Sequence, residues 1–269
     1  MKIPALLAVF LFLSARVIHA QGSLTPPGSP SPTMKSLDQI QPRTPISYAG
    51  YGIYIPGSYY LTTNVVGFSG VNGLNIICDN VTVDLNGFTL QGVSGSQSGI
   101  NISGVNTNII VRNGVIRDWG GDGINGGLSS QNLIVDHVTV SGSGVNGIQG
   151  NNCIISDCSL QNNQWDGIVV VGNGSRISHN VCIGNNLANH ANGASIAIEG
   201  SNNLVEDNFV VGTAGLYGIQ IYGGTTSNVI VKNNVNGWGT GDYALAPFND
   251  IGPIGAATNS TSPWANIAH

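Results

Sequence analysis

The sequence predicts an all-β protein, a right-handed parallel β-helix of about seven coils with a cap at each end. From Leu74 onwards a short phrase recurs, in which a small or polar residue precedes an aliphatic one. The aliphatic members, spaced 26, 24, 24, 20, 28 and 23 residues apart, are Leu74, Ile100, Ile124, Ile148, Ile168, Ile196 and Ile219. A repeat of this length, made of short β-rich runs without a helical period, is typical of a solenoid of stacked coils.

A second column supports this prediction, because each phrase is followed by a β-branched run and then a polar residue. These polar residues are Asn86, Asn113, His137, Asp157, Asn180, Asn208 and Asn234. Stacked strands lie about 4.8 Å apart, so amides at one position can hydrogen-bond along the stack. Asn also accepts the left-handed backbone that a tight corner requires. We therefore predict that the column is structural and that His137 hydrogen-bonds within it.

The composition agrees with many strands and many corners. The chain of 269 residues contains 39 Gly and 32 Asn, and only 8% of its residues are charged. An average domain has about 7% Gly and about 25% charged residues. Each coil is expected to bury one face of three short strands, and seven coils exceed the three or so that a stack needs.

Residues 1–20 have the pattern of a signal peptide. Lys2 precedes an apolar stretch over residues 3–13 that is too short to span a bilayer, and Ala20 ends a small-residue cleavage site before Gln21. No later stretch is apolar enough to serve as an anchor, so we predict no membrane span. The expected location is secreted or at the cell surface.

The mature chain is predicted to be acidic. Loss of Lys2 and Arg16 leaves 6 of the 8 basic residues against 13 acidic ones, a net charge near −7. Nucleic acids and anionic lipids are bound through basic patches, so neither is an expected partner.

The remaining chain divides into four predicted segments. Five prolines between Gly22 and Thr44 indicate an extended Pro-rich linker over residues 21–45. Residues 46–71 alternate like strands and are expected to cap the first coil, since a solenoid end exposes unpaired strand edges. The β-helix then occupies 72–236, and residues 237–269, which lose the repeat, are predicted to form the C-terminal cap.

Several stretches resemble a secreted family of right-handed parallel β-helix repeat proteins common in planctomycete and verrucomicrobial genomes. They are residues 24–30, 33–40, 42–46, 56–62 (PGSYYLT), 79–88 (DNVTVDLNGF) and 263–266 (PWAN). The resemblance covers nearly the whole mature chain. It implies a fold related to pectate lyases and other carbohydrate-active β-helices. It implies no activity, since the members of the family are mostly uncharacterised.

The best candidate site follows from the register of the coils. Asp122, Asn146 and Asp166 occupy one position in three successive coils, which places the two carboxylates about 9.6 Å apart. This distance is near the upper end of the about 6.5–9.5 Å of inverting glycosidases. We therefore name Asp122 and Asp166 as candidate catalytic residues. The candidate substrate-binding residues are Asp118, Trp119, Asn146, Trp165 and Tyr217. The alternative is that Asp-Gly merely suits a corner.

Other enzyme signatures are incomplete in this chain. The constellations of polygalacturonases, pectate lyases and mannuronan epimerases each lack members here. No metal-ligand spacing appears, and we expect no metal and no cofactor. Four cysteines in an exported protein invite a disulfide framework, but the expectation is reduced, partly buried thiols at Cys78, Cys153, Cys158 and Cys182.

Two classes of function remain open from the sequence. The first is a carbohydrate-active β-helix that contacts polysaccharide along its face, either as a binding protein or as a polysaccharide lyase or glycoside hydrolase. The second is a non-catalytic structural or adhesive protein of the cell surface or matrix. Export and the line of carboxylates and aromatics favour the first class. The missing catalytic constellation favours the second.

Overall fold

A computed structural model describes residues 42–189, 193–212 and 217–268. The predicted signal peptide and all but the end of the predicted linker lie outside these residues, so both stay predictions. The account below concerns the unit Arg43–His269.

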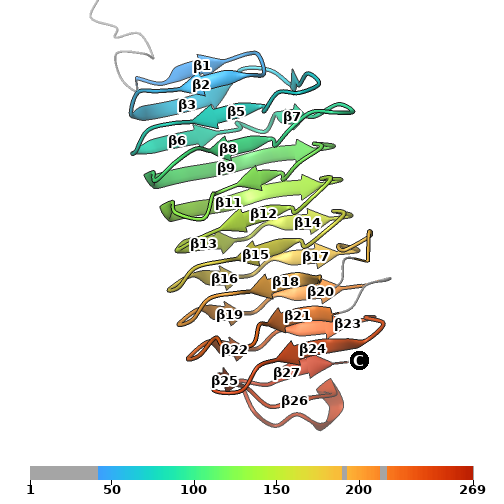
Figure 1. Ribbon diagram of the computed structural model, residues 1–269. Coiled ribbons are helices and arrows are strands. Elements are labelled where there is room, and N and C mark those ends of the chain that lie inside the picture. Colours follow the sequence, from blue (N-terminus) through green and yellow to red (C-terminus); the bar gives the residue numbers. More distant parts are fainter. Residues whose placement is uncertain (1–41, 190–192, 213–216, 269) are drawn as a thin grey trace, which may run out of the picture. The chain divides into compact units, whose positions relative to one another are not determined.

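This unit is a parallel β-solenoid, as predicted, built on a nine-stranded sheet and an 18-stranded sheet (Figure 1). Every coil places one strand in the nine-stranded sheet. Its strands are β2 (Tyr51–Ile53), β5 (Leu74–Ile76), β8 (Ile100–Ile102), β10 (Ile124–Asn125), β12 (Ile148–Gly150), β15 (Ile168–Val170), β18 (Ala194–Ile198), β21 (Tyr217–Ile221) and β24 (Gly241–Leu245). All pairings between these strands are parallel.

The 18-stranded sheet consists of two parallel ladders, which two long strands join. The first ladder contains β1 (Thr44–Ile46), β3 (Gly57–Leu61), β6 (Val81–Asp84), β9 (Thr107–Arg117), β11 (Gln131–Ser141), β13 (Cys153–Ser156), β16 (Arg176–Ser178), β19 (Leu204–Glu206), β22 (Val229–Val231) and β25 (Asp250–Ile251). The second contains β4 (Val65–Val66), β7 (Thr89–Gln91), the later halves of β9 and β11, β14 (Ser159–Gln161), β17 (Val181–Ile183), β20 (Phe209–Val211), β23 (Asn234–Asn236), β26 (Ile254–Gly255) and β27 (Asn266–Ala268). Each coil therefore has three strand segments.

Stacked aliphatic columns fill the interior of the solenoid. The recurring phrase supplies one column, whose seven members from Leu74 to Ile219 are all fully buried. The first ladder of the larger sheet supplies Val83, Val111, Val135, Ile155, Ile177, Val205 and Ile230, and the second supplies Leu90, Ile116, Val140, Leu160, Cys182, Val210 and Val235. Because the members of these columns are apolar, each coil buries them against the coils above and below.

The predicted Asn column combines two different structural columns. Asn86, Asn113, His137 and Asp157 have φ between 52° and 59° and form the corner between the two ladders. In later coils this corner residue is His179, Asp207 and Lys232. Asn180 and Asn208 come one residue after the corner and are buried, whereas Asn234 begins β23 and is half-buried. Relative to the corner, the predicted column is therefore displaced by one residue at Asn180 and Asn208 and by two residues at Asn234.

The buried asparagines form a ladder along the stack. Asn180, Asn208, Asn233 and Asn266 each accept, at Oδ1, a hydrogen bond from a backbone N–H of the preceding coil, with N–O distances of 3.0 to 3.1 Å. Their Nδ2 atoms donate to backbone carbonyls of the coil before, such as those of Ile155 and Ile177. The ladder thus forms hydrogen bonds with backbone N–H and carbonyl groups that have no partner in the sheets because the chain turns at the corner.

The two predicted caps contain strands that continue the ladders. In residues 46–71, β2 pairs with β5, β3 with β6, and β4 with β7. In residues 237–269, β24 pairs with β21 and β25 with β22. The one helix among the described residues is a single 3-10 turn, Ala257–Asn259. No described helix is therefore long and apolar enough to cross a bilayer.

All four cysteines are free thiols, as expected. Cys153, Cys158 and Cys182 are buried, and Cys78 is half-buried. Burial raises the pKa of Cys153 to about 11 and that of Cys158 to about 12, and it raises the pKa of Cys182 further. The thiolate is the reactive form, so these three are expected to be inert in the native protein.

Alkylation of the native protein with iodoacetamide is therefore expected to modify Cys78 first and the other three thiols only after denaturation. Mass spectrometry of the adducts checks this. Simultaneous labelling of all four, or a mass two protons lower per cysteine pair, would contradict it.

Candidate functional site

Asp122, Asn146 and Asp166 are aligned, as the register predicted, at the corner that precedes the nine-stranded sheet. The side chain of each residue accepts a hydrogen bond from a backbone N–H of the following coil. Asn146 N donates to Asp122 Oδ1 (2.9 Å), Asp166 N to Asn146 Oδ1 (3.2 Å) and Ala194 N to Asp166 Oδ1 (2.7 Å). All three side chains are buried. One side-chain oxygen of each residue therefore has a structural role. This agrees with the alternative that these residues are present because they suit a corner of the coil.

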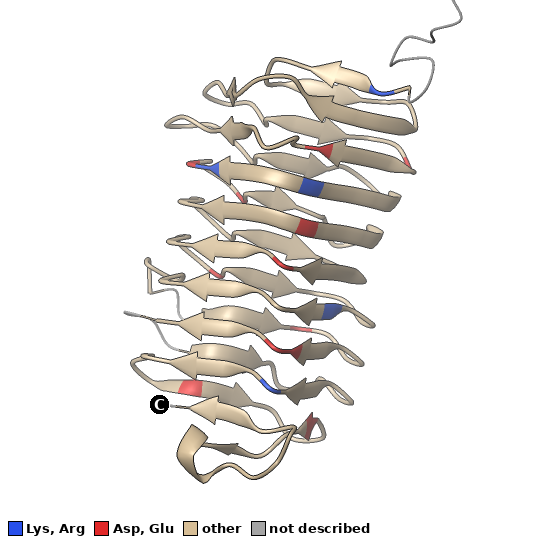
Figure 2. Cartoon of the chain, turned by 180° about the vertical axis from the view of Figure 1, so that it is seen from behind, with Lys and Arg blue, Asp and Glu red and all other residues tan. Residues whose placement is uncertain are grey.

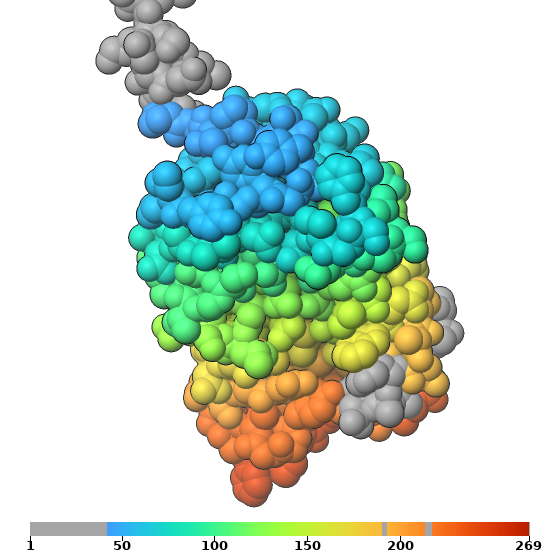
Figure 3. Space-filling view, turned by 45° about the horizontal axis from the view of Figure 1, so that its top comes forward, coloured from blue at the N-terminus to red at the C-terminus, as the bar shows by residue number. Residues whose placement is uncertain are grey.

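A pocket of about 280 Å³ opens on the outer face of the nine-stranded sheet, over β12, β15, β18 and β21. Its lining residues are Leu128, Asn146, Gln149, Trp165, Asp166, Val169, Val171, Glu199 and Tyr222. These positions lie side by side because the coils are in register: Gln149 pairs with Val169, and Val170 with Ile198 and then Ile221. The pocket therefore joins residues of five coils, since Leu128 follows β10. In the space-filling view the colours follow one another along the stack in sequence order (Figure 3).

The floor of the pocket is apolar, and its rim is aromatic and acidic. Val169, Ala194 and Ala197 form a small buried cluster outside the main core, against which Val171, Tyr217 and Tyr222 pack. Trp165 is 38% exposed. An apolar floor with a few converging polar groups is the usual composition of a small-molecule site.

The carboxyl groups and the phenol of the pocket interact electrostatically. Burial raises the pKa of Asp166 to about 7, and the charge of Glu199 adds to this rise, against the hydrogen bond from Ala194 N, which lowers it. Burial, together with the charges of Asp166 and Glu199, raises the pKa of Tyr222 to about 12. Near neutral pH, Asp166 therefore exists in both its protonated and its ionised form.

Basic residues are confined to the other side of the solenoid. The five Lys and Arg residues that the structure describes are Arg43, Arg112, Arg117, Arg176 and Lys232, and all lie on or beside strands of the 18-stranded sheet (Figure 2). Four of them pair with Asp84, Asp118 or Glu206, and Lys232 lies 3.8 Å from Asp207. The described lining of the pocket therefore contains carboxyl groups and no basic residue.

The structure brings together three of the seven predicted site residues, namely Asn146, Trp165 and Asp166. Tyr217 lies on the same face, packed against the apolar cluster beside the pocket. Asp122 belongs to the same corner ladder but does not line the pocket. Asp118 is exposed at another corner and pairs with Arg117 at 2.9 Å.

The prediction for Trp119 is wrong, because this side chain belongs to the core. It is 1% exposed, and its Nε1 donates to Leu90 O at 3.0 Å. The indole occupies the space left by the missing side chains of Gly67 and Gly73. Its place in the sequence near the line of Asp122, Asn146 and Asp166 suggested a surface position, but the chain turns inwards after the corner at Asp118.

Glu199 and Tyr222 were not among the predicted residues. Both follow directly after strands of the nine-stranded sheet, β18 and β21, and their preceding residues Ile198 and Ile221 are paired. The signal available in the sequence was their common offset of three residues from Ile196 and Ile219 in the repeated phrase. That offset places both residues at the C-terminal ends of two neighbouring strands of the nine-stranded sheet.

A second, larger cavity of about 520 Å³ lies on the 18-stranded sheet. It is lined by Leu204, Glu206, Val229, Val231, Asp250, Ile251, Gly252, Pro253, Ser262 and Trp264. Its lining is mostly aliphatic, and Glu206 is neutralised by Arg176 at 2.6 Å. Asp250, which also lines this cavity, takes part in none of the ion pairs between described residues, so the charge here is only partly compensated.

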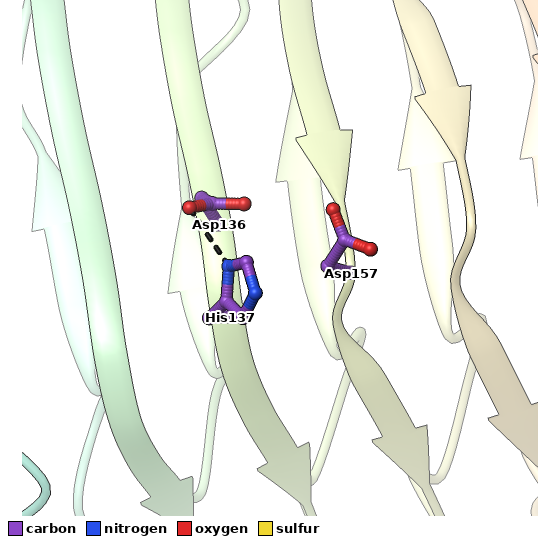
Figure 4. Close-up of side chains that lie close together, drawn as sticks. All are labelled: Asp136, His137 and Asp157. Carbon is purple, nitrogen blue, oxygen red and sulfur yellow. Dashed lines mark ion pairs between the residues drawn. The ribbon is translucent and has the colours of Figure 1, made fainter.

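Asp136, His137 and Asp157 form a group on the outer face of the larger sheet (Figure 4). His137 Nδ1 lies 2.9 Å from Asp136 Oδ2, and one ligand atom from each residue lies within 4.8 Å of the others. The hydrogen bond to Asp136 is the main cause that raises the pKa of His137. Ser156 Oγ also donates to Asp136 (3.1 Å). The group is explained by an ion pair within one coil, with Asp157 beside it on the next coil, and we assign it no ligand.

Comparison with known proteins identifies the fold. No family model and no curated protein matches the chain. Among solved structures, the A-module of the mannuronan C-5 epimerase AlgE6 of Azotobacter vinelandii superposes with a TM-score of 0.55 at 18% identity, over 78% of this chain and 60% of that one. The alginate lyase of Paenibacillus sp. strain FPU-7 gives 0.51 at 14% identity, over 84% and 88%. Dettilon tailspike protein gives 0.55 at 11% identity, over 84% and 61%.

These likenesses establish a shared β-helix fold. The epimerase and the lyase act, by name, on mannuronan and alginate, which are substrates of those proteins. The chain spans 60% of the length of the epimerase module. At identities of 11 to 18%, function has to be argued from the site itself.

Proposed function

We propose that this protein is exported and binds polysaccharide along the outer face of its nine-stranded sheet, with the pocket at Trp165, Asp166 and Tyr222 as the central contact. The observation that carries the proposal is the pocket's combination of aromatic rings, carboxyl groups and an apolar floor. Rings pack on the C–H face of a sugar, while carboxyl and amide groups bind its hydroxyls. Polysaccharide-acting proteins with the same fold support this choice.

A row of amides extends from the pocket along the same face. Asn75, Asn101, Asn125 and Gln149 are paired in successive strands β5, β8, β10 and β12. All four are half-buried, and Asn101 Nδ2 lies 3.4 Å from Asn75 Oδ1. Each amide offers both donors and an acceptor, which is what a chain of sugar hydroxyls requires. The row favours an extended ligand that runs along the stack.

Catalysis is a second candidate, and a single observation favours it. A carboxylic acid with a pKa of about 7, as at Asp166, is suited to general acid catalysis near neutral pH. Against it, Asp122 is outside the pocket, so the pair of carboxyls named from the sequence does not meet there. Asp166→Asn separates the two functions: an enzyme loses turnover and keeps binding, whereas a binding protein changes little.

Trp165→Ala is expected to weaken polysaccharide binding about tenfold, because an aromatic stacking surface is lost from the rim of the pocket. The fold is expected to persist, since Trp165 is 38% exposed. The matched control is Trp264→Ala, which removes an exposed indole from the other sheet, where it packs on Lys232.

The measurement is isothermal titration of the purified mature protein with neutral and acidic polysaccharides, together with melting curves of both variants. Equal losses in the two variants would contradict the assignment of the face. The proposed function itself fails if the wild-type protein binds none of these polymers at millimolar concentrations of sugar.

A further inference from the structure

The pocket carries negative charge that no described Lys or Arg residue on its side of the solenoid neutralises. Glu199 is exposed and takes part in none of the ion pairs between described residues. Asp166 has one oxygen bound to Ala194 N, and it lies close enough to Glu199 to be influenced by its charge. The described Lys and Arg residues all belong to the other sheet. Among the described residues that line the pocket, a ligand meets two carboxyl groups and no basic side chain.

The aromatic and aliphatic walls increase the effect of these carboxyl groups. Trp165 and Tyr222 line the pocket, and Val169 and Val171 form its floor. Electrostatic interactions are stronger beside such apolar surfaces than in bulk water. Ring faces also attract cations, by an amount that grows as the cation loses its water. An acidic sugar would instead bring a further negative charge beside the carboxylate of Glu199.

We propose that this pocket binds the ammonium group of an amino sugar, so that the protein's polysaccharide is an amine-bearing glycan and not a polyuronate. The ammonium group donates to the carboxylate of Glu199 and to the carbonyl oxygen of the Asp166 carboxyl group, and the sugar ring packs on Trp165 or Tyr222. The inference rests on the proposed function, since it names the class of glycan for the same face. The pocket of about 280 Å³ lies at the lower limit of the roughly 300–1,000 Å³ of drug-sized sites, which fits a single sugar unit.

The test compares three oligosaccharides of equal length with the full mature protein. Glucosamine tetramer and N-acetylglucosamine tetramer share one backbone and differ at the amine, where acetylation removes the positive charge and adds an acetyl group. Guluronate tetramer carries the opposite charge. Titrations at mildly acidic pH, where the sugar amines are protonated, are expected to show the glucosamine tetramer binding at least about tenfold more tightly than its acetylated form. The guluronate tetramer is expected to bind most weakly, and added salt should reduce the preference.

Glu199→Gln tests the residue that carries the charge. Glutamine keeps the size and hydrogen-bonding capacity of the side chain, so the preference for the free amine is expected to fall to about twofold or less. Asp157→Asn is the matched control, because it removes one exposed carboxylate from the larger sheet at a corner that Asn tolerates. The control is expected to keep the full preference.

Each outcome separates this inference from the proposed function. Equal or tighter binding of the acetylated or guluronate tetramer overturns the inference and leaves polysaccharide binding in place. A preference that survives Glu199→Gln, or that does not change with salt, also overturns it. If none of the three binds and the wider set of polysaccharides fails as well, the proposed function falls and the inference falls with it.

Discussion

Replacement of Asn208 by Ala is expected to destabilise the protein by about 3 kcal/mol, because a buried amide with four partners is lost. Asn208 is 1% exposed. Its Oδ1 accepts from Asn180 N and Asn180 Nδ2, both at 3.0 Å. Its Nδ2 donates to Ile177 O at 3.0 Å and to Asn233 Oδ1 at 2.9 Å. Alanine leaves a backbone N–H and a backbone carbonyl buried without partners, and each such group costs about 1–3 kcal/mol.

The measurement is a urea unfolding curve of each variant, and Asn234→Ala is the matched control. Asn234 is half-buried at the start of β23, and its side chain makes none of the ladder hydrogen bonds. Its replacement is expected to change the free energy of unfolding by less than about 0.5 kcal/mol. If Asn234→Ala were as destabilising as Asn208→Ala, the ladder would not be the stabilising element. Coils interact mainly with their neighbours, so the loss is also expected to promote local opening around β19.

The stability of the native protein is expected to fall as the pH rises from about 4 to about 7, and Asp166→Asn is expected to remove most of this fall. The pKa of Asp166 is about 7 in the folded chain and 3.8 in the reference state. Between these values the folded protein binds more protons than the unfolded chain, so the free energy of unfolding decreases with pH. The stabilisation is complete below the lower pKa and is lost above the upper one. For a shift of this size it is on the order of a few kcal/mol.

Other groups contribute to the same profile. Burial also raises the pKa of Asp122, so some pH dependence is expected to remain in Asp166→Asn. Glu199 and Tyr222 face Asp166 from the neighbouring coils, and the charge of Glu199 adds to the rise of its pKa. Asparagine can still accept the hydrogen bond from Ala194 N, so the variant is expected to be more stable than the wild type at alkaline pH.

Unfolding curves across this pH range check the prediction, with Asp250→Asn as the control. Asp250 is exposed in β25, far along the chain from the pocket. The control is expected to keep the slope of the wild type. An unchanged slope in Asp166→Asn would show that Asp166 is ionised and solvated in the folded protein.

The aliphatic column of the repeat was predictable from the sequence, whereas the division of the polar residues between corner and ladder was not. The phrase that begins at Leu74 determined the register of the nine-stranded sheet, because its aliphatic member is buried in every coil. The polar column did not determine which residue forms the corner, because Asn occurs both at left-handed corners and in buried ladders. His179 and Asp207 occupy the corner in later coils, and the adjacent Asn180 and Asn208 occupy the ladder. Only the backbone angles separate the two roles.

The candidate site shows the same division. The period of the repeat by itself determined the fold and the alignment of Asp122, Asn146 and Asp166, because inward apolar residues allow only one register. It did not determine which side chains share a pocket. Trp119 turns into the core, while Glu199 and Tyr222, from coils 23 residues apart, reach Asp166. Those positions depend on how each corner bends and on what fills the space beside it. The repeat fixes one position in each coil and does not determine the bend of the corner or the packing beside it. Only the tertiary structure therefore decided which residues form the site.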